Sequence, residues 1–196
     1  MTVLGKSVVG AALLDWQGGR MDGAEVLRSV KRVGDLGGVF ADERARAGMD
    51  AAAAVYWVEW VEPVASGTEG GLFWGSTRIE PGCVGDEYFM TRGHFHAVRD
   101  RGEFYGTVSG KGMLVLMEED GRTRVERMEP GSLHSIAGRV AHRTVNTGDE
   151  PLVFWACWPS DAGHDYASIE ARGFGVRLMR GNGSPRVVSA GVGDGI

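Results

Sequence analysis

Two histidines separated by one residue, His94 and His96, precede a glutamate, Glu103, in the stretch GHFHAVRDRGE. Side chains alternate across an extended strand, so both imidazoles would point to the same side. Glu103 and Tyr105 share one face of the next predicted strand, and a third histidine, His142, follows a further strand. Three imidazoles and one carboxylate suit a divalent first-row metal such as Fe, Mn, Ni, Co or Zn, and they leave a position open for water or substrate.

A His-x-His pair alone is weak evidence for a metal site, because strand histidines also occur without any metal. The pattern here is longer, since Gly110 follows Glu103 in a GKG turn and Asn146 follows His142. We interpret the GKG turn as a hairpin, which predicts four ligands around a small β-barrel. His134 fits no such motif, and we interpret it as a surface residue of a strand.

The elements that must position these side chains are predicted to be mostly strands. Short runs such as GMLVLMEE, RTRVERME and PLVFWACW alternate with turns rich in Gly, Pro, Asn and Asp. This pattern favours an antiparallel sandwich or barrel, and the 32 glycines agree with many tight turns. We expect a strand over 54–62, further strands in GVRLMR and RVVSA, and a loop in SDAGHDYASIEARGF.

The N-terminal region is predicted to be different. Val26, Val30 and Val33 recur at helical spacing, which predicts a helix over residues 20–36. The stretch GGVFADERARAGMD is predicted to be a turn and a short polar helix, and SVVGAALLDW is read as an opening strand.

We interpret residues 1–196 as a single domain. It consists of an N-terminal extension with a helix over about 1–50, a barrel over about 54–158 and a flexible tail over about 190–196.

Composition narrows the class of protein. A chain of 196 residues with 43% hydrophobic and 24% charged residues can bury a sizeable core. The net charge of -5 and the lack of a basic run argue against a nucleic-acid partner. No apolar run approaches the roughly 20 residues of a membrane helix. Cys83 and Cys157 are too few for a disulfide framework, so we expect reduced thiols in a cytoplasmic protein.

The two histidine motifs resemble those of the cupin superfamily, whose members are jelly-roll β-barrels. Within it, TRGHFHAVRDRGEFYGTVSGKG, AHRTVNTGDEPLVF and PSDAGHDY resemble the cupin-type phosphoglucose isomerases, and VKRVGDLGGVFADERA resembles their N-terminal region. The likeness runs from about Val30 to Phe174. It implies an all-β cupin fold and a homodimer. It also implies metal-dependent interconversion of glucose 6-phosphate and fructose 6-phosphate, as in glycolysis and gluconeogenesis.

The resemblance also implies roles for individual residues. The metal ligands of the family match His94, His96, Glu103 and His142. The positions that hold the sugar phosphate match Thr77, Thr91 and Gly93. The residues that line the sugar pocket match Tyr56, Tyr105, His164 and Tyr166. Among them, Glu103, Tyr105 and His164 are the candidates for proton transfer and ring opening.

Two features depart from the family pattern. Trp158 stands where the family usually has a tyrosine whose hydroxyl helps to hold phosphate, and an indole can donate a hydrogen bond but not accept one. Arg139 lies in a segment that usually carries prolines and aromatics, where it either adds a cation at the pocket mouth or lies in solvent. Two alternatives therefore stay open. One is a cupin metalloenzyme for another phosphosugar or for a non-phosphorylated polyol or keto compound; the other is a non-catalytic sugar-binding cupin.

Overall fold

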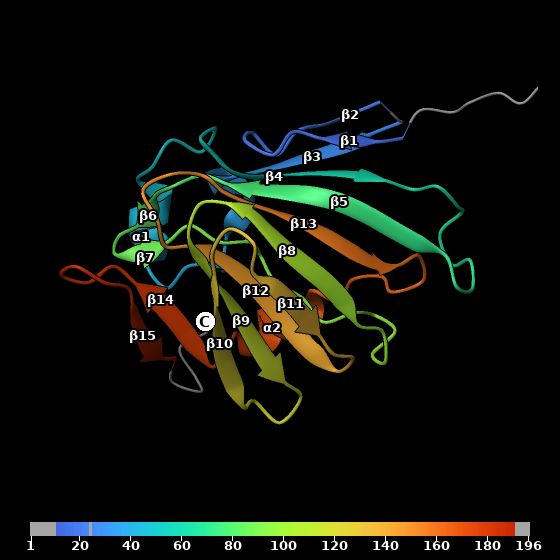
Figure 1. The fold of residues 1–196 in the computed structure, drawn as a ribbon. Helices are drawn as coiled ribbons and strands as arrows, with labels where there is room; N and C mark the ends of the chain where they lie inside the picture. Colours follow the sequence, from blue (N-terminus) through green and yellow to red (C-terminus); the bar gives the residue numbers. More distant parts are fainter. Residues whose placement is uncertain (1–10, 24, 191–196) are drawn as a thin grey trace, which may run out of the picture.

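The computed structural model describes residues 11–23 and 25–190, which form mainly antiparallel β-sheet (Figure 1). The largest sheet has six strands, in the spatial order β11 (Leu133–Ile136), β8 (Glu103–Ser109), β13 (Leu152–Pro159), β5 (Leu72–Ile79), β4 (Ala54–Val61) and β3 (Leu27–Arg32). Below it in Figure 1 lies a three-stranded sheet of β10 (Thr123–Met128), β9 (Gly112–Glu118) and β12 (Val140–Asn146).

Smaller elements complete the described part of the chain. A four-stranded sheet contains β15 (Arg186–Ser189), β14 (Val176–Met179), β7 (Glu87–Tyr88) and β6 (Cys83–Val84). A hairpin of β1 (Leu13–Leu14) and β2 (Met21–Asp22) lies over the outer side of the largest sheet (Figure 1). The helical turns are η1 (Val33–Leu36), α1 (Glu43–Ala47) and α2 (Ala167–Arg172). This architecture confirms the predicted all-β cupin fold.

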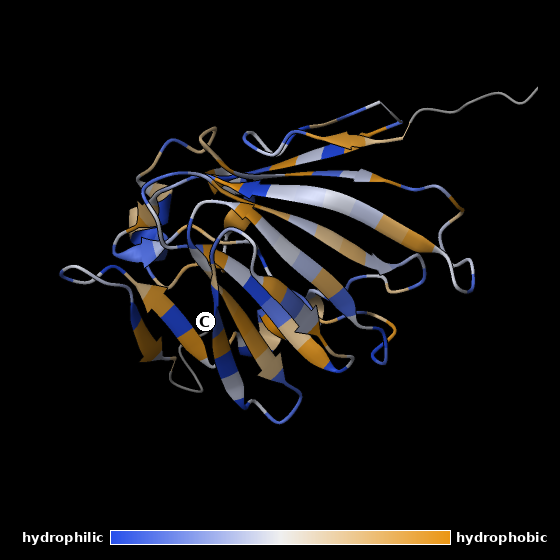
Figure 2. Cartoon of the chain, viewed as in Figure 1, coloured by the Kyte–Doolittle hydropathy of each residue, from blue (hydrophilic) through white to orange (hydrophobic). Residues whose placement is uncertain are grey.

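The hydrophobic core is formed by residues of the sheets that face each other. Leu114 and Leu116 of β9 are fully buried, and so are Ile79 and Leu152, which pair across β5 and β13. Burying each such side chain stabilises the fold by about 1.5–3 kcal/mol. Figure 2 shows bands of hydrophobic and hydrophilic residues along the strands, as expected where one face of a sheet is buried. Among the described residues, no helix is both long and apolar enough to span a membrane.

The predicted helix over 20–36 is wrong. This stretch forms β2, then β3, and ends in the single 3-10 turn η1. Valines at helical spacing also suit a strand, because β-branched side chains pack well on a pleated sheet, and pairing with β4 decides the outcome. The predicted strand over 54–62 and the short helix after Asp42 are confirmed by β4 and α1.

Three smaller expectations also need correction or restriction. The GKG turn is not a hairpin, because β8 pairs with β11 and β13 while β9 pairs with β10 and β12, so the turn passes from one sheet to the other. Gly110 there has φ +81°, and a Cβ atom would come within 2.4 Å of the Pro151 carbonyl oxygen. The predicted loop after Pro159 contains α2. Of the predicted opening strand, residues 7–10 lie outside the described residues, and the described part contains β1. All of the predicted tail except residue 190 lies outside them.

Candidate metal centre

Four side chains converge between the two main sheets. The ligand atoms of His94, His96, Glu103 and His142 all lie within 4.8 Å of one another, so the group could hold a metal ion. Glu103 is the first residue of β8 in the six-stranded sheet, and His142 lies in β12 of the three-stranded sheet. The predicted ligand set is thus brought together by the packing of one sheet against the other.

His94 and His96 are held by backbone pairing although they lie outside the named strands. The backbone amides of His94 and His142 each donate to the other residue's carbonyl, at 3.2 and 3.0 Å. The next residue, Phe95, makes a similar bridge to Asp165. The segment is therefore extended, as the alternation argument requires, but it is not the regular strand that was predicted.

The chemistry of this cluster fits a divalent metal. His94 Nε2, Glu103 Oε1 and His142 Nε2 are buried and have no hydrogen-bond partner among the described residues. His142 Nε2 approaches Glu103 Oε1 to 2.6 Å without hydrogen-bond geometry. Buried polar atoms left unpaired cost free energy, and a cation between them would satisfy all three. His96 Nδ1 donates to the Arg101 carbonyl at 2.7 Å, which leaves Nε2 free to face the cluster.

Electrostatics favour the protonation states that a metal needs. Burial lowers the pKa of His94 well below its usual value, and the neighbouring imidazoles lower it further. Burial alone raises the pKa of Glu103, but the facing imidazoles of His142 and His96 outweigh it, so the pKa lies below its usual value. Neutral imidazoles and an ionised carboxylate are the forms that bind metal.

A cavity of about 430 Å³ opens beside the cluster. Its walls are the inner faces of β3, β4, β5, β8 and β13 together with the 91–94 and 163–166 segments. The lining includes three of the four candidate metal ligands, namely His94, Glu103 and His142. All residues that the resemblance assigned to sugar or phosphate also line it: Tyr56, Thr77, Thr91, Gly93, Tyr105, His164 and Tyr166. The residues that were predicted from the sequence to bind the sugar phosphate therefore lie in one pocket.

The 91–93 segment is held in place by residues of β12. Thr91 Oγ1 accepts the amide of Thr144 at 3.0 Å, and the Arg143 guanidinium donates to the Arg92 carbonyl at 2.6 Å. Gly93 has φ +75°, and a Cβ atom there would come within 2.7 Å of the Phe174 ring. Only glycine fits this position, so its backbone can approach a ligand closely.

His164, Tyr166 and Tyr105 lie at the metal side of the cavity, against the His94 and His142 rings. The rings of His164 and Tyr166 are parallel, with centroids 5.6 Å apart, and His164 lies 4.4 Å from the His94 ring. Burial raises the pKa of Tyr105 well above its usual value, and the adjacent Glu103 raises it further. Burial raises the pKa of Tyr56 to about 12. Both phenols are therefore neutral donors at ordinary pH.

Sequence reasoning missed two cationic residues of the pocket. Lys31 and Arg92 both line the cavity. Lys31 pairs with Tyr56 across β3 and β4, so it was hidden by the incorrect helix prediction. The alternation in LRSVKR, which puts Ser29 and Lys31 on one face, is the signal that could have revealed it.

The two departures from the family pattern have different surroundings. Trp158 lines the cavity and makes an edge contact with Phe73, with ring centroids 6.3 Å apart. Cys157 of β13 pairs with Phe104 of β8. Because the two strands are antiparallel, the next position along them brings Trp158 beside Glu103. Arg139 is exposed at the surface and pairs with Asp100 at 2.7 Å, so its position agrees with the solvent alternative.

Two further polar residues, His134 and Asn146, are buried and hydrogen-bonded within the fold. His134 is only 5% exposed, so the expectation of a surface residue is wrong. Its ring nitrogens contact Glu126 and Ser132 at 2.8 and 2.9 Å, which satisfies the buried imidazole. Asn146 donates to the carbonyls of Ile79 and Glu150 and so fixes the end of β12.

The sequence is similar to known proteins over most of its length. The family model "Glucose-6-phosphate isomerase (GPI)" matches residues 30–189. The glucose-6-phosphate isomerase of Pyrococcus horikoshii is 42% identical over 180 residues, covering 89% of this chain and 92% of the relative. That of Thermococcus litoralis is 41% identical over 172 residues, covering 87% and 88%. That of Sinorhizobium medicae is 39% identical over 153 residues, covering 76% and 71%.

Among solved structures, a mutant of Bacillus subtilis oxalate decarboxylase gives a TM-score of 0.44 at 22% identity. The match covers 56% of this chain and 27% of that one.

Proposed function

Because this chain belongs to the glucose-6-phosphate isomerase family, we propose that it is a metal-dependent isomerase that interconverts glucose 6-phosphate and fructose 6-phosphate. The observation that carries the proposal is that three members of the four-ligand cluster line the same cavity as the candidate phosphate residues. A sugar phosphate bound there would have its C1–C2 end at the cluster and its phosphate at the threonines.

In this proposal, His94, His96, Glu103 and His142 hold one divalent metal ion, Fe, Mn, Ni or Zn. When bound, the ion supplies Lewis-acid chemistry that polarises neighbouring sugar oxygens. The protein contributes a water-poor site, since the side chains of Glu103 and His142 are only 5% and 3% exposed. Low exposure strengthens electrostatic interactions with the open-chain sugar.

Proton transfer is assigned to side chains at the metal side of the cavity. Glu103 is ionised and faces the cavity, so it can take a proton from one sugar carbon and return it to the neighbouring carbon. Tyr105, which neighbours Glu103, and His164 are placed to move protons between the ring oxygen and the hydroxyls during ring opening. Tyr166 stacks on His164 and keeps its ring in one orientation.

Phosphate recognition is assigned to the far part of the cavity. Thr77 of β5 pairs with Phe154 of β13. Phe154 is four residues from Trp158, which lies beside Glu103, so Thr77 is about 13 Å along the strand from the metal side. The Thr77 and Thr91 hydroxyls, the Gly93 backbone and the Tyr56 hydroxyl are the neutral donors of this region. Lys31 adds positive charge there, which suits a phosphate dianion in a chain whose net charge is -5.

An enzyme-coupled assay in both directions tests the proposal. Protein stripped of metal by a chelator should be inactive, and adding one of the four metals back should restore turnover. Absence of turnover with every metal, in folded protein with metal bound, would refute the isomerase assignment.

One observation favours a second candidate function, action on a different sugar. Trp158 occupies the wall next to Glu103, where a bulky indole restricts the part of the substrate near the reacting carbons. Thermal-shift screening against phosphorylated and non-phosphorylated sugars separates the two, because a specific ligand raises the melting temperature. Preference for a compound without phosphate would favour the second candidate.

We further propose that the protein is a cytoplasmic homodimer acting in glycolysis or gluconeogenesis. The outer face of the largest sheet exposes apolar side chains, including Trp74, Phe104 and Leu133 at 38%, 57% and 74% exposure. A second copy covering this face would remove them from water. Light scattering should give twice the 21.0 kDa chain mass, and Phe104→Glu should shift it toward the monomer.

A further inference from the structure

The segment that carries His164 and Tyr166 is attached to the metal-ligand segment by backbone pairing and by side chains outside the cavity. The Val98 backbone amide donates to the Ala162 carbonyl at 3.0 Å, and the Asp165 backbone amide donates to the Phe95 carbonyl at 2.8 Å. His164 and Tyr166 both line the cavity, and the Asp165 carboxylate between them bonds to Arg99 and Ser168 instead. The contacts of this carboxylate therefore add to the backbone pairing that holds the segment with both cavity residues.

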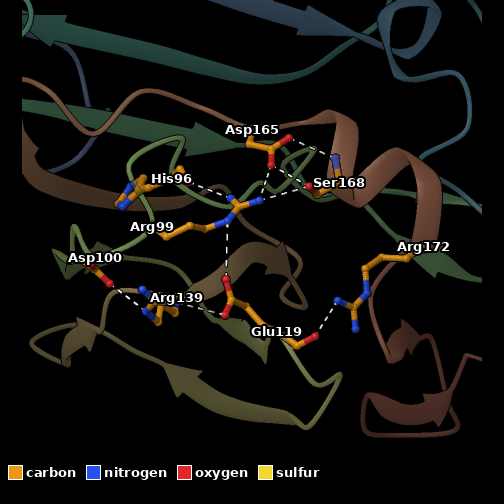
Figure 3. Close-up of polar contacts among 8 residues, drawn as sticks. All are labelled: His96, Arg99, Asp100, Glu119, Arg139, Asp165, Ser168 and Arg172. Atoms are coloured by element: carbon orange, nitrogen blue, oxygen red, sulfur yellow. Dashed lines mark hydrogen bonds and ion pairs between the residues drawn. The ribbon is translucent and has the colours of Figure 1, made fainter.

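Arg99 is the group that holds it. Its guanidinium donates to the Asp165 carboxylate, to the Ser168 hydroxyl at 3.1 Å and to the His96 carbonyl at 2.7 Å (Figure 3). One side chain thus joins the backbone of a candidate metal ligand to the segment that covers the cavity. The planar fork of arginine suits three acceptors at once, which a lysine cannot match.

Neighbouring contacts restrict Arg99 further. Its guanidinium carbon lies 4.5 Å from the Phe95 ring centroid. Its Nε lies 3.7 Å from the Glu119 carboxylate, as Figure 3 shows. Ser168 and Arg99 together lower the pKa of Asp165 to about 2, so the carboxylate is ionised at any working pH. Arg99 and Asp165 are 66 residues apart in the sequence, so their spacing does not reveal the pair.

We propose that Arg99 is a positioning residue of the isomerase reaction, acting through Asp165 to hold His164 and Tyr166 against the metal centre. The inference rests on the proposed function, because its effect on turnover presupposes that function. Two matching ion pairs flank it. Arg101 bonds to Asp161 in bidentate fashion and Arg92 pairs with Glu170, so three arginines of one segment bond to three acids of the other.

The test is a double-mutant cycle with a matched control. Arg99→Leu should lower kcat/KM by roughly 10- to 100-fold, as expected of a displacement of about 1 Å at the reacting groups. In a His164→Gln, Tyr166→Phe background the same change should have less than about threefold effect, because Arg99 acts through those residues. The control is Arg28→Leu, since Arg28 also bonds a carboxylate and a backbone carbonyl but lies on β3. It should leave kcat/KM unchanged.

Two further readouts make the result decisive. Hydrogen exchange of the 162–168 amides should accelerate in Arg99→Leu and not in Arg28→Leu, while bound metal stays at the wild-type level. Additive effects in the cycle, unchanged exchange or loss of metal would each overturn the positioning role. An inactive wild-type enzyme would refute the proposed isomerase, whereas the exchange measurement would still decide whether Arg99 holds the segment.

Discussion

The metal centre and the sheet wall of the cavity are built in different ways. Three of the four ligands, His94, His96 and Glu103, come from ten consecutive residues, and His142 joins them through a backbone pairing with His94. The wall opposite the 91–94 segment is spread over five strands, with two or three cavity residues from each. Removing one ligand should therefore abolish metal binding and turnover together. Removing one wall contact should only weaken the binding of the substrate.

The largest effect is expected from breaking the centre. His142→Ala removes one of four ligands and should reduce turnover by at least about 100-fold, since even outer partners of metal ligands account for 10- to 100-fold. Metal content measured on purified protein should fall in parallel. His134→Gln is the matched control, because His134 is equally buried but contacts Glu126 and Ser132 instead. A His142→Ala protein with full metal content would contradict the ligand assignment.

A smaller effect is expected from the wall at Lys31. Lys31→Met keeps the length of the side chain and removes its charge, and charged hydrogen bonds contribute about 1.5–3 kcal/mol. KM for the sugar phosphate should therefore rise roughly tenfold or more while metal content stays unchanged. Lys111→Met, at an exposed turn, provides the control. An equal rise in both variants would show that only general charge is involved.

A still smaller effect is expected from substituting Trp158 in the wall of the cavity. Trp158→Phe keeps an aromatic ring against Phe73 but opens space beside Glu103. Adding or removing a small group in a pocket is worth about 1–3 kcal/mol. Because phenylalanine keeps the aromatic contact, we take the lower end, about 1 kcal/mol, and expect a shift of roughly fivefold in preference among sugars. Relative kcat/KM for several hexose phosphates measures it. A loss of phosphate dependence would mean that Trp158 contacts the phosphate.

The smallest effect is expected at the surface. Arg139→Ala removes exposed ion pairs with Asp100 and Glu119, and such pairs contribute only about 0–1 kcal/mol. Turnover should stay within about twofold of the wild type, and the melting temperature should change little. A large rise in KM would place Arg139 at the pocket mouth after all.

The same contrast explains what could be predicted from the sequence. The centre was predictable because His94, His96 and Glu103 are close in sequence, and the two histidines have the spacing of strand alternation. Lys31 was missed because valine spacing in 20–36 fits a helix as well as a strand, and pairing with β4 decides between them. His134 was misjudged because its burial depends on Glu126 in another strand. Arg99 and Asp165 meet only through the fold.

The most direct test of the account is a metal titration of turnover. Protein stripped of metal is mixed with increasing amounts of Mn or Fe, and the conversion of glucose 6-phosphate to fructose 6-phosphate is measured. We predict no activity in the stripped protein and a linear rise that ends at one metal ion per chain. Full activity without metal, or none at any metal ratio, would contradict the central claim.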